Sequence, residues 1–366
     1  MRALCTYLLL LSLVVVGGAQ QNEVQEREKD QPTVTVQSTL VEVPILVKKK
    51  SGEVVFQLSA DDFLLTDNGV PQHLTLDQDT DSQPLALAIV VETGGAGARH
   101  LNDYRQLDSI LEGLIGDIEH RVAVIGFDST PHMAMLFKPR TSDAAWQLGN
   151  LDQGDQGAAI LDAIALAAEK LRKQPRQYRR AILLLSETID QGSKTTLGEA
   201  LRLISDTNIQ IYSFAFSSTG SAVSHEISKL NSSEPGPPHG CFSHDGADPE
   251  YEGHYSKQVL DCISQLAPPL RLATMGFITA RNSLRTNTAE SVAQLAGGEF
   301  HHFHDGKSLR TGLIELSNDI PNYYVVSFRP TSPTPGPHAL HVETKGRKQL
   351  VLTSRREYWI DDQAAY

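Results

Sequence analysis

The chain has 366 residues and a formal net charge of −12, with 44 acidic against 32 basic side chains. No block of lysine or arginine interrupts the acidic balance, which argues against nucleic acid or an anionic membrane surface as a partner. The length exceeds what one compact core usually organises, so we expect one large domain with smaller additions.

The N-terminus has the order of features that is typical of a cleavable signal peptide. A basic start at Arg2 precedes an apolar run, Leu8 to Val16, and small residues at Gly17 to Ala19. The apolar run is shorter than the roughly 20 residues of a membrane-spanning helix, and no later segment is apolar enough to span. We predict a signal peptide over residues 1–19, a flexible polar leader over residues 20–33, and a secreted or periplasmic mature chain with no membrane span.

Two groups of short β-rich segments flank the middle of the chain. Residues 34–80 alternate β-branched and polar side chains between Ser-Gly and Asn-Gly turns, and residues 323–360 contain three similar runs. Neither group is large enough to hold a core of its own. We therefore predict that the two groups pair into one small, sandwich-like β module beside the central domain.

Residues 85–320 alternate strand and helix patterns. Leu85 to Val91 is apolar on both faces, as expected for a buried parallel strand, whereas Met133 to Phe137 is short and near a proline, as expected at an edge. The alternation predicts right-handed βαβ units and a doubly wound, mostly parallel α/β sheet that is Rossmann-like. It stops at about residues 231–272, which we interpret as an inserted loop.

Four motifs stand in a recognisable order. They are Leu58-Ser-Ala-Asp-Asp-Phe63, Asp67-Asn-Gly-Val-Pro71, Glu92-Thr-Gly-Gly95 after the first apolar strand, and Ser354-Arg-Arg-Glu-Tyr-Trp359. In order and spacing the chain resembles the bacterial von Willebrand factor A-related family, from about Val34 to Ile360. The resemblance implies a von Willebrand factor A-like α/β domain.

Metal-binding members of that wider superfamily hold a divalent cation above the carboxyl ends of the strands. Their ligands come from an Asp-x-Ser-x-Ser turn, a later Thr and a later Asp. The resemblance places the following residues at those five positions: Glu92, Gly94, Ala96, Ala158 and Glu187. Since three hydroxyl ligands are missing, we predict a degenerate metal-ion-dependent adhesion site with no metal and no cofactor. The alternative is Mg²⁺ or another divalent cation on Glu92 and Glu187, with Asp190.

Two histidine-containing segments offer other metal ligands. The insertion contains five candidates for zinc without tight ligand spacing: His239, Cys241, His244, His254 and Cys262. The run His301, His302 and His304 also looks metal-binding, but only His302 and His304 share one face of a strand. We favour a strand end at the surface, with Asp305 beginning the next helix.

The sequence contains no complete set of catalytic residues that we recognise. Asp128-Ser129 and Ser186-Glu187 follow strands, but neither a Gly-x-Ser-x-Gly elbow nor a histidine partner accompanies them, which argues against an extracytoplasmic hydrolase. The glycines at residues 94–97 do not have dinucleotide-loop spacing.

We expect a non-enzymatic protein–protein interaction module, an adhesin or scaffold. Its binding surface would lie on the loops at the carboxyl ends of the strands, after Glu92, Phe127, Gly157 and Glu187, together with the cysteine-containing insertion. The sequence does not identify the protein partner.

Of the three cysteines, Cys241 and Cys262 follow the predicted signal peptide. In an oxidising compartment an isolated pair favours a disulfide. We predict that the two are bonded, closing a loop of about 20 residues worth roughly 3 kcal/mol. Thiol labelling of the denatured, unreduced mature protein should find no free thiol, and two labelled thiols would contradict the bridge.

Overall fold

The computed structural model describes residues 40–77, 83–216, 287–347 and 349–361. All of these belong to one contact unit, Ser38–Tyr366. The predicted signal peptide, leader, insertion, zinc ligands and disulfide lie outside the described residues. No helix in the described ranges is long and apolar enough to cross a membrane.

The middle of the chain builds a six-stranded sheet with the order β10-β9-β8-β5-β6-β7. Five strands are parallel, and β7 pairs antiparallel with β6 at the edge, where the sequence predicted it. The strands are β5 (Leu85–Glu92), β6 (His120–Phe127), β7 (Pro131–Lys138), β8 (Arg179–Glu187), β9 (Ile209–Phe216) and β10 (Phe300–His302). Strand order reverses between β5 and β8, so the sheet is doubly wound.

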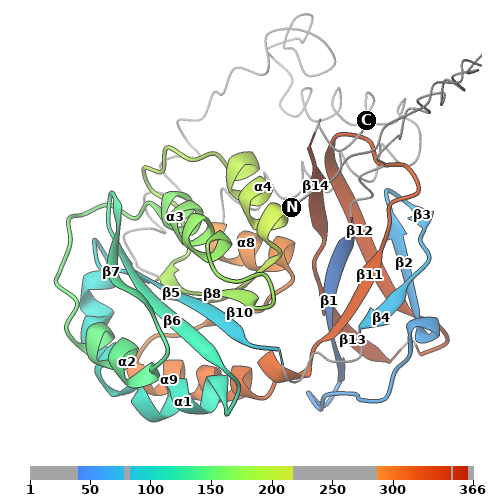
Figure 1. Cartoon of the computed structure of the whole chain (residues 1–366). Helices are drawn as coiled ribbons and strands as arrows, with labels where there is room; N and C mark the ends of the chain where they lie inside the picture. Colours follow the sequence, from blue (N-terminus) through green and yellow to red (C-terminus); the bar gives the residue numbers. More distant parts are fainter. Residues whose placement is uncertain (1–39, 78–82, 217–286, 348, 362–366) are drawn as a thin grey trace, which may run out of the picture. The chain divides into compact units, whose positions relative to one another are not determined.

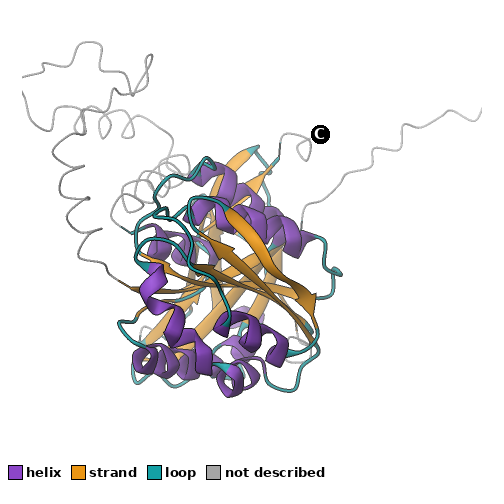
Figure 2. Ribbon diagram, turned by 90° about the vertical axis from the view of Figure 1, so that its left-hand side faces the viewer, coloured by secondary structure: helices purple, strands orange, loops and turns teal. Residues whose placement is uncertain are grey.

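Helices cover both faces of this sheet, which is why β5 and β9 are buried along their whole length (Figures 1 and 2). One face carries η3 (Gly97–Gln106), α1 (Asp108–Ile115), α2 (Thr141–Gly149) and α9 (Gly306–Ser317). The other carries α3 (Ile160–Arg172), α4 (Leu197–Thr207) and α8 (Thr288–Ala296). Two of these helices begin with a capping side chain: Thr196 and Glu199 form a capping box on α4, and Asn287 accepts a hydrogen bond from the Glu290 amide on α8.

The two ends of the described chain pair with each other in two four-stranded sheets around one shared core. Their orders are β13-β1-β11-β4 and β14-β12-β2-β3. The strands are β1 (Val41–Lys49), β2 (Phe63–Asp67), β3 (Val70–Pro71), β4 (Thr75–Asp77), β11 (Tyr324–Phe328), β12 (Gly336–Thr344), β13 (Leu350–Ser354) and β14 (Glu357–Ile360), with short 3₁₀ turns η1 (Ala60–Asp62) and η4 (Ile320–Asn322). Within the predicted β-rich segment 34–80, the apolar residues 54–56 form no strand and make only a bridge, from Val54 to Lys48.

The predicted fold class is therefore confirmed: a doubly wound, mostly parallel sheet with a flanking β module built from both ends of the chain. β1 pairs with β11 and β13, and β2 pairs with β12, so each sheet of the module draws strands from both ends. The domain boundaries near residues 80–85 and 320–323 remain predictions.

The closing Ser354–Trp359 motif lies against helices α4 and α8. The buried Arg355 guanidinium donates from Nη2 to the carbonyl of Ile204 at 3.4 Å, in the last turn of α4. The Trp359 amide donates to Ser205 Oγ at 2.7 Å, and the Arg356 amide donates to the carbonyl of Leu295 at 3.3 Å. Carbonyls at a helix C-terminus carry partial negative charge, so the cation of Arg355 suits this position.

Lys48 on β1 makes a second connection between the β module and the α/β domain. Its Nζ lies 2.9 Å from Glu299 Oε1 and 2.6 Å from Asp319 Oδ2. Burial raises the pKa of Asp319 to about 6, whereas hydrogen bonds from His301 and Lys48 outweigh burial at Glu299 and hold its pKa low. One cation thus lies between two carboxylates, and its loss would leave them close together without the lysine's charge.

We predict that Lys48→Met lowers the free energy of unfolding by about 2–4 kcal/mol, because it leaves the largely buried carboxylates of Glu299 and Asp319 without their cationic partner. The side chain of Lys48 is 21% exposed. The neighbouring Lys49, 53% exposed and paired with Glu53, is the control, and Lys49→Met should cost under about 1 kcal/mol. Urea unfolding of both variants measures this, and equal costs would contradict the role of Lys48.

Candidate functional site

The carboxyl ends of β5 and β8 lie at the point where the strand order reverses, which is where doubly wound sheets usually bind ligands. Glu92 ends β5 and Glu187 ends β8. The structure brings the two residues together, since the backbone amide of Glu187 donates to Glu92 Oε2 at 2.6 Å. The loops after β5 and β8, and the segment leading into α3, meet around this contact.

The carboxyl group of Glu92 is fully buried and already bonded to the protein. Its Oε1 accepts from the amide of Gly97 at 3.0 Å, while Oε2 accepts from the amide of Glu187. Burial, together with the charge of Glu187, raises the pKa of Glu92 to about 8 against the opposing effect of the two amides. The carboxyl group thus connects the segment after the β5 turn, at Gly97, with the end of β8, at Glu187.

No side chain fits at Gly94. A Cβ there would lie 2.6 Å from the carbonyl oxygens of Asp155 and Gly157, and 2.8 Å from Cβ of Asp128. These distances are far shorter than a carbon can approach without displacing backbone. The position of the first serine ligand is therefore filled by the loop that precedes α3, and a hydroxyl could not be accommodated on this backbone.

The other expected ligand positions are also engaged in loop structure. Ala158 and Gln191 pair through their backbones, and Gln191 Nε2 donates to Glu187 Oε1 at 2.7 Å. Asp190 accepts from the amide of Leu161 at 3.0 Å and from Ser193 Oγ at 2.5 Å, so it caps the start of α3. Ala96 carries no oxygen on its side chain. Taken together, the ligand positions do not fit a divalent cation of the usual type.

Sequence reasoning missed Asp155, which organises the loop before α3. Its Oδ1 accepts from the amides of Ser129 at 3.0 Å and Gly157 at 2.8 Å, and Oδ2 accepts from the Ser129 hydroxyl. Its own amide donates to Asp128 Oδ2 at 3.1 Å. The only local signal was an Asp two residues before a glycine, which is common in turns.

The serines weighed as nucleophiles take part in this loop structure. Ser129 is bonded to the carboxylate of Asp155, and the buried Ser186 hydroxyl donates to the carbonyl of Glu187 at 2.8 Å. Neither of these bonds is to a histidine, which is the partner that activates a serine in the usual triad.

The histidines at the end of β10 line an open surface hollow of about 550 Å³ with Lys307 and Glu315. His301 stacks on Phe214 with ring centroids 4.8 Å apart, and its Nε2 lies 3.4 Å from Glu299 Oε2. Asp305 caps α9 by accepting from the amide of Ser308 at 2.7 Å, as the favoured interpretation required. Across the described ranges, no three His, Cys, Asp or Glu side chains are arranged to hold a metal ion.

No protein-family model matches the sequence, and no curated protein matches it significantly. Among solved structures, the von Willebrand factor domain of the type V pili tip protein Mfa5 from Porphyromonas gingivalis is 14% identical, with a TM-score of 0.26, over 30% of this chain and 39% of that one. BatB from Bacteroides thetaiotaomicron is 13% identical, with a TM-score of 0.36, over 64% of this chain and 97% of that one.

Proximal thread matrix protein 1 from the mussel byssus, in a structure with a zinc-occupied MIDAS motif, is 14% identical, with a TM-score of 0.33, over 40% of this chain and 38% of that one. The chain therefore spans about two fifths of the Mfa5 and byssus chains and nearly all of BatB. It resembles von Willebrand factor A-type proteins. This is the resemblance that the sequence motifs indicated.

We predict that Gly94→Ser, which returns the missing hydroxyl, lowers the free energy of unfolding by about 1–3 kcal/mol and creates no Mg²⁺ site, because the added atoms displace the carbonyls of Asp155 and Gly157. Gly113→Ala is the control, since Gly113 lies in α1 with open space around it. That change should stabilise by up to about 1 kcal/mol. Urea unfolding with and without Mg²⁺ measures both, and an undiminished stability of Gly94→Ser would disprove the crowding.

Proposed function

We propose that the chain is an exported, non-enzymatic protein–protein interaction module, an adhesin or scaffold, that binds its partner through the carboxyl-edge loops without a bound metal ion. One observation carries the proposal. The position of a serine ligand, at Gly94, is filled by the carbonyls of Asp155 and Gly157, while both oxygens of Glu92 are bonded to backbone amides. The residues that would hold a cation instead hold the loops together.

A rigid set of loops supports partner binding at this edge. The loops after β5, after β6 and before α3 are joined by the carbonyl and carboxylate of Asp155, which accept from the amides of Gly95 at 2.7 Å and Ser129 at 3.0 Å. Exposed side chains of mixed character project from these loops and from the loop after β8, and they include Arg99, Gln153, Gln156 and Lys194. Pre-organised loops lose little conformational freedom on binding, which favours affinity.

The alternative is a cation held by Glu92 and Glu187, with Asp190. It is favoured by the proximity of the first two carboxyl groups, since the charge of Glu187 raises the pKa of Glu92 and a cation would relieve that repulsion. A site of this kind requires Glu92 to give up its hydrogen bonds from the amides of Gly97 and Glu187 and to coordinate the metal ion instead.

Calorimetric titration with Mg²⁺, Mn²⁺ and Ca²⁺ separates the two proposals. For the metal-independent module we expect no stoichiometric heat, and an unchanged thermal midpoint after dialysis against a strong chelator. Binding of one ion that Glu92→Gln weakens, or a midpoint that falls on chelation and is restored by one divalent ion, would replace it with the cation site.

Partner binding is tested by capture from the extracellular fraction in the presence of a chelator. A partner that binds the carboxyl edge should be lost from bait carrying Gln156→Arg and Lys194→Glu, because both residues are exposed on these loops. Lys50→Glu makes the same lysine-to-glutamate change at an exposed residue of the β module and should leave capture intact. Equal capture by the unmodified chain, the Gln156→Arg/Lys194→Glu double variant and Lys50→Glu would place the binding surface elsewhere.

A further inference from the structure

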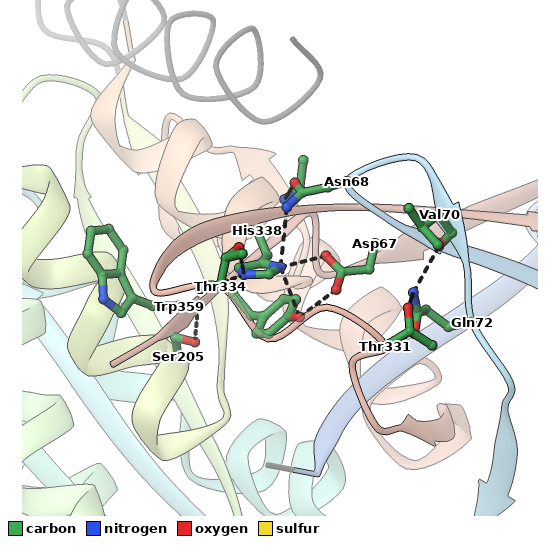
Figure 3. Close-up of polar contacts among 11 residues, drawn as sticks. Asp67, Asn68, Val70, Gln72, Ser205, Thr331, Thr334, His338 and Trp359 are labelled. Carbon is green, nitrogen blue, oxygen red and sulfur yellow. Dashed lines mark hydrogen bonds and ion pairs between the residues drawn. The ribbon is translucent and has the colours of Figure 1, made fainter. Parts of the chain in front are cut away.

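Two motifs that lie far apart in the chain meet in the β module around His338. Asp67 and Asn68 belong to the Asp-Asn-Gly motif at the end of β2, and Tyr358 belongs to the closing motif on β14. His338 lies on β12, the strand between them (Figure 3). Asp67, His338 and Tyr358 are only 4%, 1% and 3% exposed, so water does not satisfy their polar atoms.

Each nitrogen of the His338 ring faces an oxygen that accepts hydrogen bonds. Nε2 lies 2.7 Å from the carbonyl oxygen of Thr334, which has no hydrogen to give, so Nε2 must carry a proton. Nδ1 lies 2.8 Å from Asp67 Oδ1. A neutral ring with its hydrogen on Nε2 would put a lone pair against an ionised carboxylate, so one further proton must lie between Nδ1 and Asp67.

The surroundings of Asp67 favour that proton on the ring. The Tyr358 hydroxyl donates to Asp67 Oδ2 at 2.8 Å, which stabilises the ionised carboxylate. The same hydroxyl oxygen lies 3.1 Å from Nδ1 and can accept from it. Asn68 Oδ1 accepts from the amide of Ala339 at 3.0 Å, which directs Nδ2 toward Nδ1 at 3.3 Å. Because Nδ2 can only donate, this longer contact is not a hydrogen bond when Nδ1 carries a proton.

The polar groups next to the ring come from three segments: Asp67 and Asn68 at the end of β2, the loop residue Thr334, and Tyr358, whose ring centroid lies 4.8 Å from that of the imidazole. Among the described residues that contact the ring, Asp67 is the only one with a charged side chain.

We propose that His338 is an imidazolium ion facing the carboxylate of Asp67 in the folded protein at neutral pH, and that loss of its proton in alkaline solution loosens the β module. This ion pair joins β2, β12 and β14, so one titrating group connects segments from both ends of the chain.

The sign of the pH dependence follows from the direction of the shift. Burial alone would lower the pKa of His338, but the hydrogen bonds to Asp67 and Thr334 outweigh it, and the pKa is raised above its ordinary value of 6.5. A raised pKa in the folded state means that the stabilisation is complete below the unfolded value. It is lost as the pH rises through the folded value.

Nitrogen NMR of the full-length, ¹⁵N-histidine-labelled chain tests the proton directly, with His338 assigned by its absence in His338→Gln. At about pH 7 both ring nitrogens should carry N–H-type shifts, and they should titrate only in alkaline solution. In Asp67→Asn the carboxylate is gone and only the carbonyl of Thr334 still opposes burial, so Nδ1 should be unprotonated at about pH 7. A neutral His338 ring in the unmodified protein, or a titration unaltered by Asp67→Asn, would overturn the proposal.

Urea unfolding at about pH 6 and about pH 9.5 tests the consequence. The unmodified chain should lose more of its urea midpoint over this interval than His338→Gln does, because other titrating groups are common to both. His341→Gln, an exposed histidine on the same strand, should behave like the unmodified chain. Equal losses in all three proteins would overturn the link to stability, and where His338→Gln does not fold, the NMR titration decides.

Discussion

The two backbone amides that donate to Glu92 organise the carboxyl edge of the sheet. One comes from Gly97, beyond the turn after β5, and the other from Glu187, at the end of β8. A carboxyl group one methylene longer than aspartate can span from the end of β5 to both donors. The point where the strand order reverses is usually open to a ligand in a doubly wound sheet. In this chain the side chain of Glu92 closes it.

A closed crossing point changes what kind of recognition the edge can support. Where a cation completes its coordination with a carboxylate from a partner, affinity depends on one strong polar bond. In the proposed metal-free module, binding would come from the shape and the exposed side chains of several loops. The bonds of Asp155 to Ser129 and Gly157, and of Asp190 to Leu161, hold those loops in fixed relative positions. Such fixed positions are what the proposed metal-free binding surface requires.

Much of the fold could be predicted because its signals are local. Strand β5, which is apolar on both faces, and the helix caps at Thr196, Asn287 and Asp305 each depend on only a few adjacent residues. The sequence analysis did not predict helix α2. Only two of its side chains, Ala144 and Leu148, are fully buried in the apolar core, so its apolar pattern is short. Local pattern shows a helix best when its apolar face is long.

The candidate site was harder to predict because it depends on contacts between residues that are far apart in the chain. The sequence revealed that Gly94 lacks a hydroxyl, but not that carbonyls from residues 155 and 157 occupy the space where one would lie. The Asp-Asn-Gly and Arg-Arg-Glu-Tyr-Trp motifs were visible as markers of resemblance, yet their meeting around His338 depends on strand pairing across about three quarters of the chain.

The pairing of β1 with β11 and β13 has a consequence for the order in which the protein is made. Val41 lies opposite Phe328, and Lys49 lies opposite Leu350. During synthesis the first of these strands emerges from the ribosome long before its neighbours exist, and its amides and carbonyls have no sheet to join. An unpaired apolar strand is prone to associate with other chains. The strand β1 stays exposed to such association until β11 and β13 have been made.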